Sequence, residues 1–124
     1  MPHEIKYDAD TECLMCRMFG EFHTSELPKF ASEVVALLNK HSCARILSDL
    51  READLCLSTL DLYAIPGLVT KAGVKQNVKR AIVFSKDVKD YRLLETVSHN
   101  RGQFVRVFTD FDEARTWIKG DEFS

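Results

Sequence analysis

The sequence lacks the short motifs that mark common catalytic sites. Its 124 residues contain no glycine-rich phosphate loop, no G-x-S-x-G nucleophile elbow and no H-x-x-x-H pair for a metal ion. His23, His41 and His99 are scattered, with no nucleophile or base beside them in the sequence. These absences predict a protein that is not an enzyme and that holds no metal or cofactor, so a binding or regulatory function is the first expectation.

Long apolar segments are missing as well. No run approaches the roughly 20 residues that a helix needs to span a bilayer, and residues 1–4 lack the basic and apolar regions of a signal peptide. No linker, repeat or low-complexity segment divides the chain. We therefore expect residues 1–124 to form a single cytoplasmic domain with a core of its own.

The four cysteines, Cys13, Cys16, Cys43 and Cys56, do not complete a metal or redox motif. Cys13 and Cys16 form a C-x-x-C pair, but the pair lies in an apolar, strand-like run and not at a helix N-terminus, where a redox pair belongs. No second C-x-x-C or matching histidine pair completes a zinc site. In a reducing cytosol we expect free thiols in or near the core.

The hydrophobic pattern predicts elements in the order β-β-α-β-α-β-α-β-α. Residues 3–7 and 12–19 read as a hairpin, and further strands are expected at 45–51, 81–84 and 104–108. The helices are expected from Thr24 or Ser25 to about Lys40, from Ser58 to near Gly73, from Asp87 to Gly102, and onward from Asp110. Strands separated by helices imply right-handed crossovers. We therefore predict an α/β fold with helices on both faces of a mixed, mainly parallel sheet of about five strands, its first strand an antiparallel edge.

Residues 45–67 are the stretch around which the chain is organised. A buried strand, with Asp49 and Arg51 near the end where α/β sheets place ligands, is followed by a polar turn at residues 52–57 with local ion pairs. Ser58 and Asp61 then have the spacing of a capping box. Pro66 and Gly67 predict a hinge that kinks or splits the helix. The apolar side chains of this helix point around most of the cylinder, and they are Leu60, Leu62, Tyr63, Ile65, Leu68 and Val69.

A helix that is apolar on two sides allows three interpretations. It could cover a pocket for an apolar, lipid-like ligand, with Tyr91 added to the six side chains above, and open at Pro66-Gly67. It could dock on an anionic membrane, because residues 62–86 contain no acid and each cation near such a surface contributes roughly 1 kcal/mol. The cations in question are Lys71, Lys75, Lys79 and Arg80. In the third interpretation both apolar faces are buried, one on the sheet and one on a neighbouring helix or the second subunit of a homodimer. Nucleic-acid binding is not expected, since the net charge is −2 and no aromatic stacking motif accompanies the lysines.

Several segments along nearly the whole chain add up to a family resemblance. They are residues 48–51 (SDLR), 57–63 (LSTLDLY), 90–92 (DYR), 100–102 (NRG) and 107–110 (VFTD), with Ala114 and Trp117. Together they resemble the SpoIIAA-like family, bacterial relatives of STAS domains with a fold also similar to the Sec14/CRAL-TRIO lipid-binding class. The resemblance implies the same α/β fold and a non-enzymatic function.

The resemblance also implies a candidate switch. STAS-type antagonists of anti-sigma factors carry a phosphorylatable serine at the start of the helix after the central strand, and Ser58 and Thr59 fall in that place. Here Leu57 replaces the acid that precedes the family's serine, and Thr59-Leu60 replaces the small residues that follow it. Ser58 is therefore either a helix cap or a phosphorylation site. The main prediction is a module that binds an apolar ligand or associates peripherally with a membrane, and the alternative is a protein–protein switch.

Overall fold

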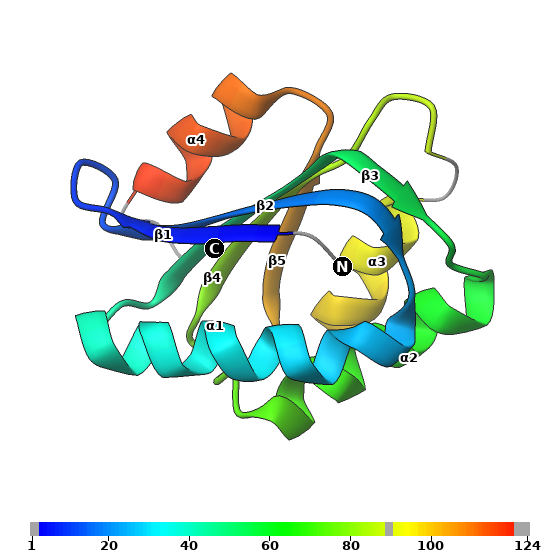
Figure 1. Cartoon of the computed structure of the whole chain (residues 1–124), viewed down its shortest axis with the longest axis horizontal. Helices are drawn as coiled ribbons and strands as arrows, with labels where there is room; N and C mark the ends of the chain where they lie inside the picture. The colour runs from blue at the N-terminus through cyan, green and yellow to red at the C-terminus, as the bar shows by residue number, and fades with distance from the viewer. Residues whose placement is uncertain (1–2, 89–90, 121–124) are drawn as a thin grey trace.

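The computed structural model describes residues 3–88 and 91–120, and it confirms the predicted order of strands and helices (Figure 1). The strands are β1 (His3–Asp8), β2 (Cys13–Phe22), β3 (Arg45–Leu55), β4 (Lys79–Val83) and β5 (Phe104–Phe108). The helices are α1 (Leu27–His41), α2 (Thr59–Ala72), α3 (Tyr91–Asn100) and α4 (Phe111–Lys119). Within the described part of the chain, none of the helices has the length and apolar character needed to cross a membrane.

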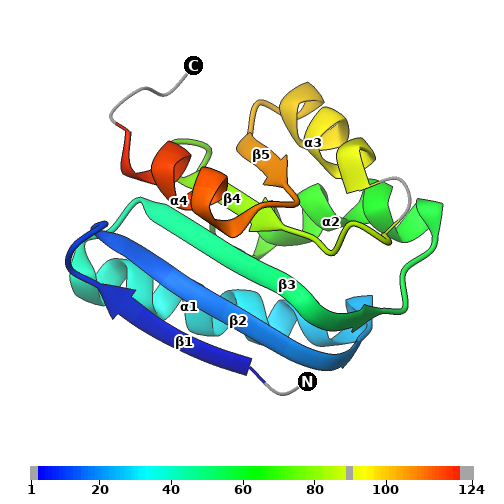
Figure 2. The same cartoon turned by 90° about the horizontal axis from the view of Figure 1, so that it is seen from above.

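The strands form one mixed sheet in the order β1-β2-β3-β4-β5. β1 is an antiparallel edge strand, as predicted, and the other neighbouring pairs are parallel. From β2 to β5, each helix connects a strand to its next neighbour on the same side in the sheet. Because these crossovers are right-handed, α1, α2 and α3 lie on one face. Of the described helices, only α4 packs on the opposite face, against β3, β4 and β5 (Figures 1 and 2).

Two apolar cores lie on the two faces of the sheet. Alternate side chains of each central strand point to opposite faces, so Ile46 and Ile82 face α1 and α2 while Leu47 and Ala81 face α4. The α4 core is the smaller, and Ala114 and Ile118 supply the helix side of it with no exposed surface. Burial on both faces explains why residues 81–84, from the end of β4 onward, read as a continuous apolar run.

Two strands are longer than the sequence predicted. β2 does not end at Gly20 but continues to Phe22, and β3 continues to Leu55 through the segment predicted to be a polar turn. The two strands stay paired to their ends, where Phe22 lies opposite Leu55, after a shift in register between Arg17 and Phe19. Backbone pairing outweighs side-chain polarity here, because the charged side chains of this extension lie at an exposed end of the sheet.

The helix ends agree with the predicted signals in part. Gly73, with a φ of 106°, ends α2 in the left-handed conformation that favours glycine, as expected. Asp110 caps α4 by accepting a hydrogen bond from the Glu113 backbone N–H at 3.0 Å. The predicted cap of α1 at Thr24 or Ser25 is wrong, since residues 24–26 form a 3₁₀ turn and α1 starts at residue 27 with no side-chain cap within the described ranges. The cap of α3 predicted at Asp87 depends on residues 89–90, which lie outside the described residues.

Candidate functional site

α2 is a single helix with one buried side and one exposed side. It continues through Pro66 and Gly67, so the predicted split is wrong. Pro66 is fully buried, and its carbonyl oxygen accepts hydrogen bonds from the Thr70 hydroxyl at 3.1 Å and from the Gln103 amide at 2.8 Å. These bonds and the surrounding packing hold the proline within a continuous helix.

The predicted apolar ligand residues of α2 divide between its two sides. Leu62, Ile65 and Val69 are buried against the sheet, and Leu68 is half-buried. Leu60 and Tyr63 are 80% and 52% exposed, so the helix keeps apolar surface that the described chain does not cover. A homodimer formed through this exposed side stays a prediction.

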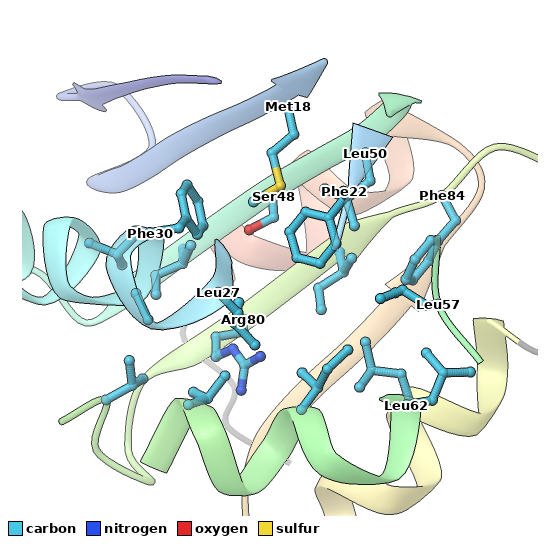
Figure 3. Close-up of a pocket in the computed structure, with 18 residues that line it drawn as sticks. Met18, Phe22, Leu27, Phe30, Ser48, Leu50, Leu57, Leu62, Arg80 and Phe84 are labelled. Carbon is cyan, nitrogen blue, oxygen red and sulfur yellow. The ribbon is translucent and has the colours of Figure 1, made fainter. Parts of the chain in front are cut away.

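A cavity of about 90 Å³ lies between α1, α2 and the sheet, and we call it the core cavity (Figure 3). Leu62, Ile65 and Val69 line it from α2. Of the described residues around it, only Ser48 and Arg80 are polar. α2 therefore covers a pocket, as one of the three interpretations of this helix expected, although the pocket is small.

Arg80 enters the core cavity from β4 and is only 8% exposed. Its guanidinium donates one hydrogen bond, from Nη1 to Oε1 of Gln103 at 3.0 Å. Burial lowers the pKa of Arg80 to about 10, and the group therefore still carries its proton at neutral pH. Figure 3 shows this charged group surrounded by apolar side chains between the sheet and α2.

Two of the four cations that were predicted to lie on an exposed basic loop are buried. β4 begins at Lys79, two residues earlier than expected, so Lys79 and Arg80 are buried strand residues that face opposite sides of the sheet. Lys79 donates to the carbonyl oxygens of Trp117 and Gly120 at 2.6 and 2.9 Å. Only Lys71 and Lys75 are exposed, which removes half of the positive charge assigned to a membrane surface.

A second, more polar pocket of about 440 Å³ lies at the carboxyl end of β3, beside the start of α2, and we call it the edge pocket. Ser58 and Thr59 lie on its rim and are exposed, and Tyr91 lines it from α3. Leu57, Leu62 and Phe84 line both pockets, so the two spaces adjoin at these three side chains, which we call the wall between them.

The predicted capping box at the start of α2 is present. The Ser58 hydroxyl accepts from the Asp61 backbone N–H at 3.2 Å, and the Asp61 carboxylate accepts from the Ser58 backbone N–H at 2.8 Å. The two bonds satisfy donors that a helix end leaves free, and the acid interacts well with the positive end of the helix. Ser58 is therefore at least a helix cap, held in a fixed place at the rim of the edge pocket.

Asp49 and Arg51 lie on β3, as predicted, and they form an ion pair with each other. The Arg51 guanidinium donates to both carboxylate oxygens of Asp49, at 2.9 and 2.8 Å, and lies 5.0 Å from the centre of the Phe111 ring. Burial alone would raise the pKa of Asp49, but the hydrogen bonds from Arg51 outweigh it and the pKa is lowered. The pair joins the strand to α4 and leaves no unpaired carboxylate for acid–base chemistry at this position.

One group of exposed side chains has the composition of a metal site. Glu21, Asp54 and Cys56 place one potential ligand atom each within 4.8 Å of one another. Metals bind the thiolate form of cysteine. Desolvation and the charges of Asp54 and Glu21 raise the pKa of Cys56, which works against that form, so we assign no metal site here.

The C-x-x-C cysteines lie on opposite faces of the sheet. Cys13 packs in the α4 core and Cys16 in the core under α1 and α2, as an i, i+3 spacing in a strand requires. All four cysteines are free, and burial raises the pKa of both Cys13 and Cys16 to about 12. The expectation of free, buried thiols is confirmed for these two.

This placement makes thiol reactivity predictable. In the native protein we expect a disulfide reagent to react faster with the exposed Cys56 than with Cys13 or Cys16, which react only after unfolding, although the raised pKa of Cys56 makes it slower than an ordinary exposed thiol. Counting released thiolate during the reaction, with Cys56→Ser as the control that removes the fast phase, checks this. Fast native modification of Cys13 or Cys16, located by peptide mapping, would contradict the burial described here.

No family model matches the sequence, and no curated protein matches it either. Solved structures do match, and one is an anti-sigma factor antagonist from Mycobacterium paratuberculosis, with a TM-score of 0.62, 12% identity and coverage of 96% of both chains. The fold is therefore the α/β fold of anti-sigma factor antagonists.

Two further matches are structures of SpoIIAA itself. The unphosphorylated form matches with a TM-score of 0.56 and 10% identity, over 96% of this chain and 99% of that one. The phosphorylated form of the Bacillus cell fate determinant SpoIIAA matches with a TM-score of 0.56 and 12% identity, over 94% and 99%. These matches confirm the SpoIIAA/STAS part of the resemblance for the fold, and they do not support the Sec14/CRAL-TRIO part.

Sequence patterns missed three features of the site. The strand period places Arg80 on the same face as Ile82 and Phe84, but the predicted strand begins only at residue 81 and therefore leaves Arg80 outside it. Gln103 follows the helix-ending Gly102, and no pattern shows that its amide reaches Pro66 on another helix. Leu57 was noted only as a departure from the family, whereas it forms part of the wall between the two pockets.

Proposed function

We propose that this chain is a regulatory protein–protein interaction module whose docking edge is the start of α2 with the edge pocket beside it, switched by phosphorylation of Ser58 or Thr59. The observation that carries the proposal is the exposed capping box at the rim of a polar pocket, in a chain with the SpoIIAA fold. One of the similar structures is a phosphorylated form, and another is described as an antagonist of an anti-sigma factor. A protein of the anti-sigma factor class is the first candidate partner.

The geometry explains how a phosphate would act. The Ser58 hydroxyl is exposed, and the carboxylate of Asp61 already occupies the Ser58 backbone N–H. A phosphate on Ser58 would add about two negative charges beside Asp61, with Asp54 and Asp87 around the same pocket. The added charge repels an acidic partner surface and requires desolvation on docking, so phosphorylation weakens the complex.

A matched pair of substitutions tests this switch. Ser58→Asn and Ser58→Asp both keep a side-chain acceptor for the Asp61 N–H, so both preserve the helix cap, but only Asp adds charge. Each variant is used as bait in an extract of the source cells. We expect a protein that wild type and Ser58→Asn retain equally and that Ser58→Asp retains at least about tenfold less, a loss of about 1.4 kcal/mol.

Mass spectrometry of the chain incubated with ATP and the captured protein should then locate phosphate on Ser58 or Thr59. Equal retention by Ser58→Asp and Ser58→Asn would mean that charge at this position does not control docking. If the captured protein binds Ser58→Asp fully and phosphorylates neither Ser58 nor Thr59, then Ser58 is a helix cap and not a switch.

The main prediction from the sequence, a lipid-like ligand or a membrane surface, has less support than the protein–protein switch. The similar structures are antagonists of anti-sigma factors, and two of the four cations assigned to a membrane surface are buried. The proposed switch also suits the cytoplasmic location expected from the sequence. What remains of the ligand prediction is the core cavity, and its chemistry differs from that of a lipid site.

A further inference from the structure

The core cavity contains a positive charge that no acid among the described residues neutralises. The salt bridges among the described residues do not include Arg80, and desolvation is the one cause that shifts its pKa. A guanidinium has five N–H donors, and the described residues offer Arg80 one side-chain acceptor, Oε1 of Gln103. Buried charges are normally paired, because an unpaired one has lost its hydration with no compensation.

Gln103 holds the guanidinium in place without cancelling its charge. Its side-chain carbonyl accepts from Arg80, while its amide donates to the Pro66 carbonyl and the Thr70 hydroxyl, each at 2.8 Å. The amide is therefore fixed to α2 at two points, which fixes the side of the guanidinium that Gln103 contacts. The remaining N–H groups are the ones available to the cavity, where Figure 3 shows Arg80 near Leu27 and above α2.

The rest of the cavity suits an apolar tail. Phe30, Ile46, Ile65 and Ile82 are among its lining side chains, and the Ser48 hydroxyl is the one other polar group among the described residues that line it. An apolar cavity of ~150 Å³ is known to admit benzene, so one of about 90 Å³ admits a smaller tail. The combination fits an anion that is small and apolar except at one end.

We propose that the core cavity binds a short-chain monocarboxylate, with its carboxylate on the Arg80 guanidinium and its hydrocarbon tail among the apolar side chains. A planar guanidinium pairs with a carboxylate through two parallel hydrogen bonds, which gives both affinity and orientation. By the comparison with benzene, the cavity holds roughly four to six non-hydrogen atoms, which limits the acid to roughly two to four carbons. A bilayer lipid is too large for it, so the ligand is a free acid.

The ligand reaches the cavity from the edge pocket. Leu57, Leu62 and Phe84 separate the two spaces, and side-chain rotations are fast compared with the opening of a helix. Leu57 belongs to the segment between β3 and α2 and is half-buried, so it is the member of the wall with the least packing to lose. The site thus needs no hinge at Pro66-Gly67.

The test compares acids with their uncharged amides. Propionate and butyrate are titrated into the purified chain by calorimetry, with propionamide and butyramide as matched neutral probes. We expect saturable binding of at least one acid and a dissociation constant at least about tenfold weaker for its amide. Equal binding of acid and amide, or binding of neither acid, would overturn the proposal.

Three variants locate the binding. Arg80→Gln removes the charge, and Ala31→Leu fills the cavity while leaving Arg80 in place, so we expect each to weaken acid binding at least about tenfold. Arg115→Gln removes an exposed guanidinium from α4, on the opposite face, and should change nothing. Full binding by Ala31→Leu would place the acid elsewhere and refute the site, even if Arg80→Gln fails to fold.

A vesicle experiment separates a free acid from a lipid headgroup. Phosphatidylglycerol vesicles are sedimented with the wild-type chain at low salt, and we expect the chain to stay in the supernatant. Sedimentation with vesicles together with no response to free acids would assign the anion site to a membrane and overturn the proposal. None of these measurements involves a protein partner, so they can fail while the Ser58 switch stands.

Discussion

Lys79→Met is expected to lower the free energy of unfolding by about 2–3 kcal/mol. The ammonium of Lys79 donates to the carbonyl oxygens of Trp117, in the last turn of α4, and of Gly120, directly after the helix, and it lies 4.4 Å from the centre of the Trp117 ring. Lys79 is 1% exposed, and methionine fills a similar volume but cannot donate. The loss therefore reports hydrogen bonds and ring contact, with little change in packing.

Urea unfolding followed by fluorescence of Trp117, the single tryptophan, measures the change. Lys40→Met is the matched control, since Lys40 is exposed near the end of α1 and its replacement should change stability by less than about 0.5 kcal/mol. If Lys79→Met is as stable as the control, then Lys79 does not hold α4 on the sheet.

The neighbouring residue is expected to behave differently. The double variant Arg80→Met with Gln103→Met should change the free energy of unfolding by less than about 1 kcal/mol, because the gain from replacing a buried charge without an acid is offset by the loss of the hydrogen bonds that the Gln103 amide donates to Pro66 and Thr70. Arg80→Met alone should be less stable than the double variant, since it leaves Oε1 of Gln103 buried without its donor, at a cost of about 1–3 kcal/mol.

The comparison with Lys79→Met makes the result specific. The two cations are consecutive on β4 and almost equally buried, but Lys79 contacts Trp117 and Gly120 at the end of α4, whereas Arg80 donates to one neutral side chain among the described residues. A double variant that is clearly less stable than wild type would show that Arg80 and Gln103 are a structural link between β4 and α2. A double variant as stable as wild type that no longer binds short acids would show that the pair is kept for binding.

The fold was largely predictable from the sequence, for physical reasons that can be named. Apolar runs with strand and helix periods alternate along the chain, and that alternation determines the crossovers and so the faces that the helices cover. The capping box of Ser58 and Asp61 was readable because it depends on two residues three positions apart. Local signals of this kind do not depend on the rest of the fold.

The site was less predictable, because it depends on contacts between distant residues. Pro66 stays inside α2 with the help of Gln103, which is 37 residues away. Lys79 lies in the core because α4, at the end of the chain, supplies carbonyl oxygens for it. The charge count of residues 62–86 was correct, but whether a cation is a surface charge or a buried donor is decided by partners that the local sequence does not contain.

The wall formed by Leu57, Leu62 and Phe84 has a consequence for signalling. A metabolite bound behind that wall and a protein docked in front of it would contact the same three side chains, so each would alter the other's affinity by the same factor. The affinity of such a chain for its protein partner would depend on two signals, the cell's supply of a small acid and the activity of a kinase. Leu57 directly precedes Ser58, so the wall residue between the two pockets and the candidate phosphorylation site are neighbours in the chain.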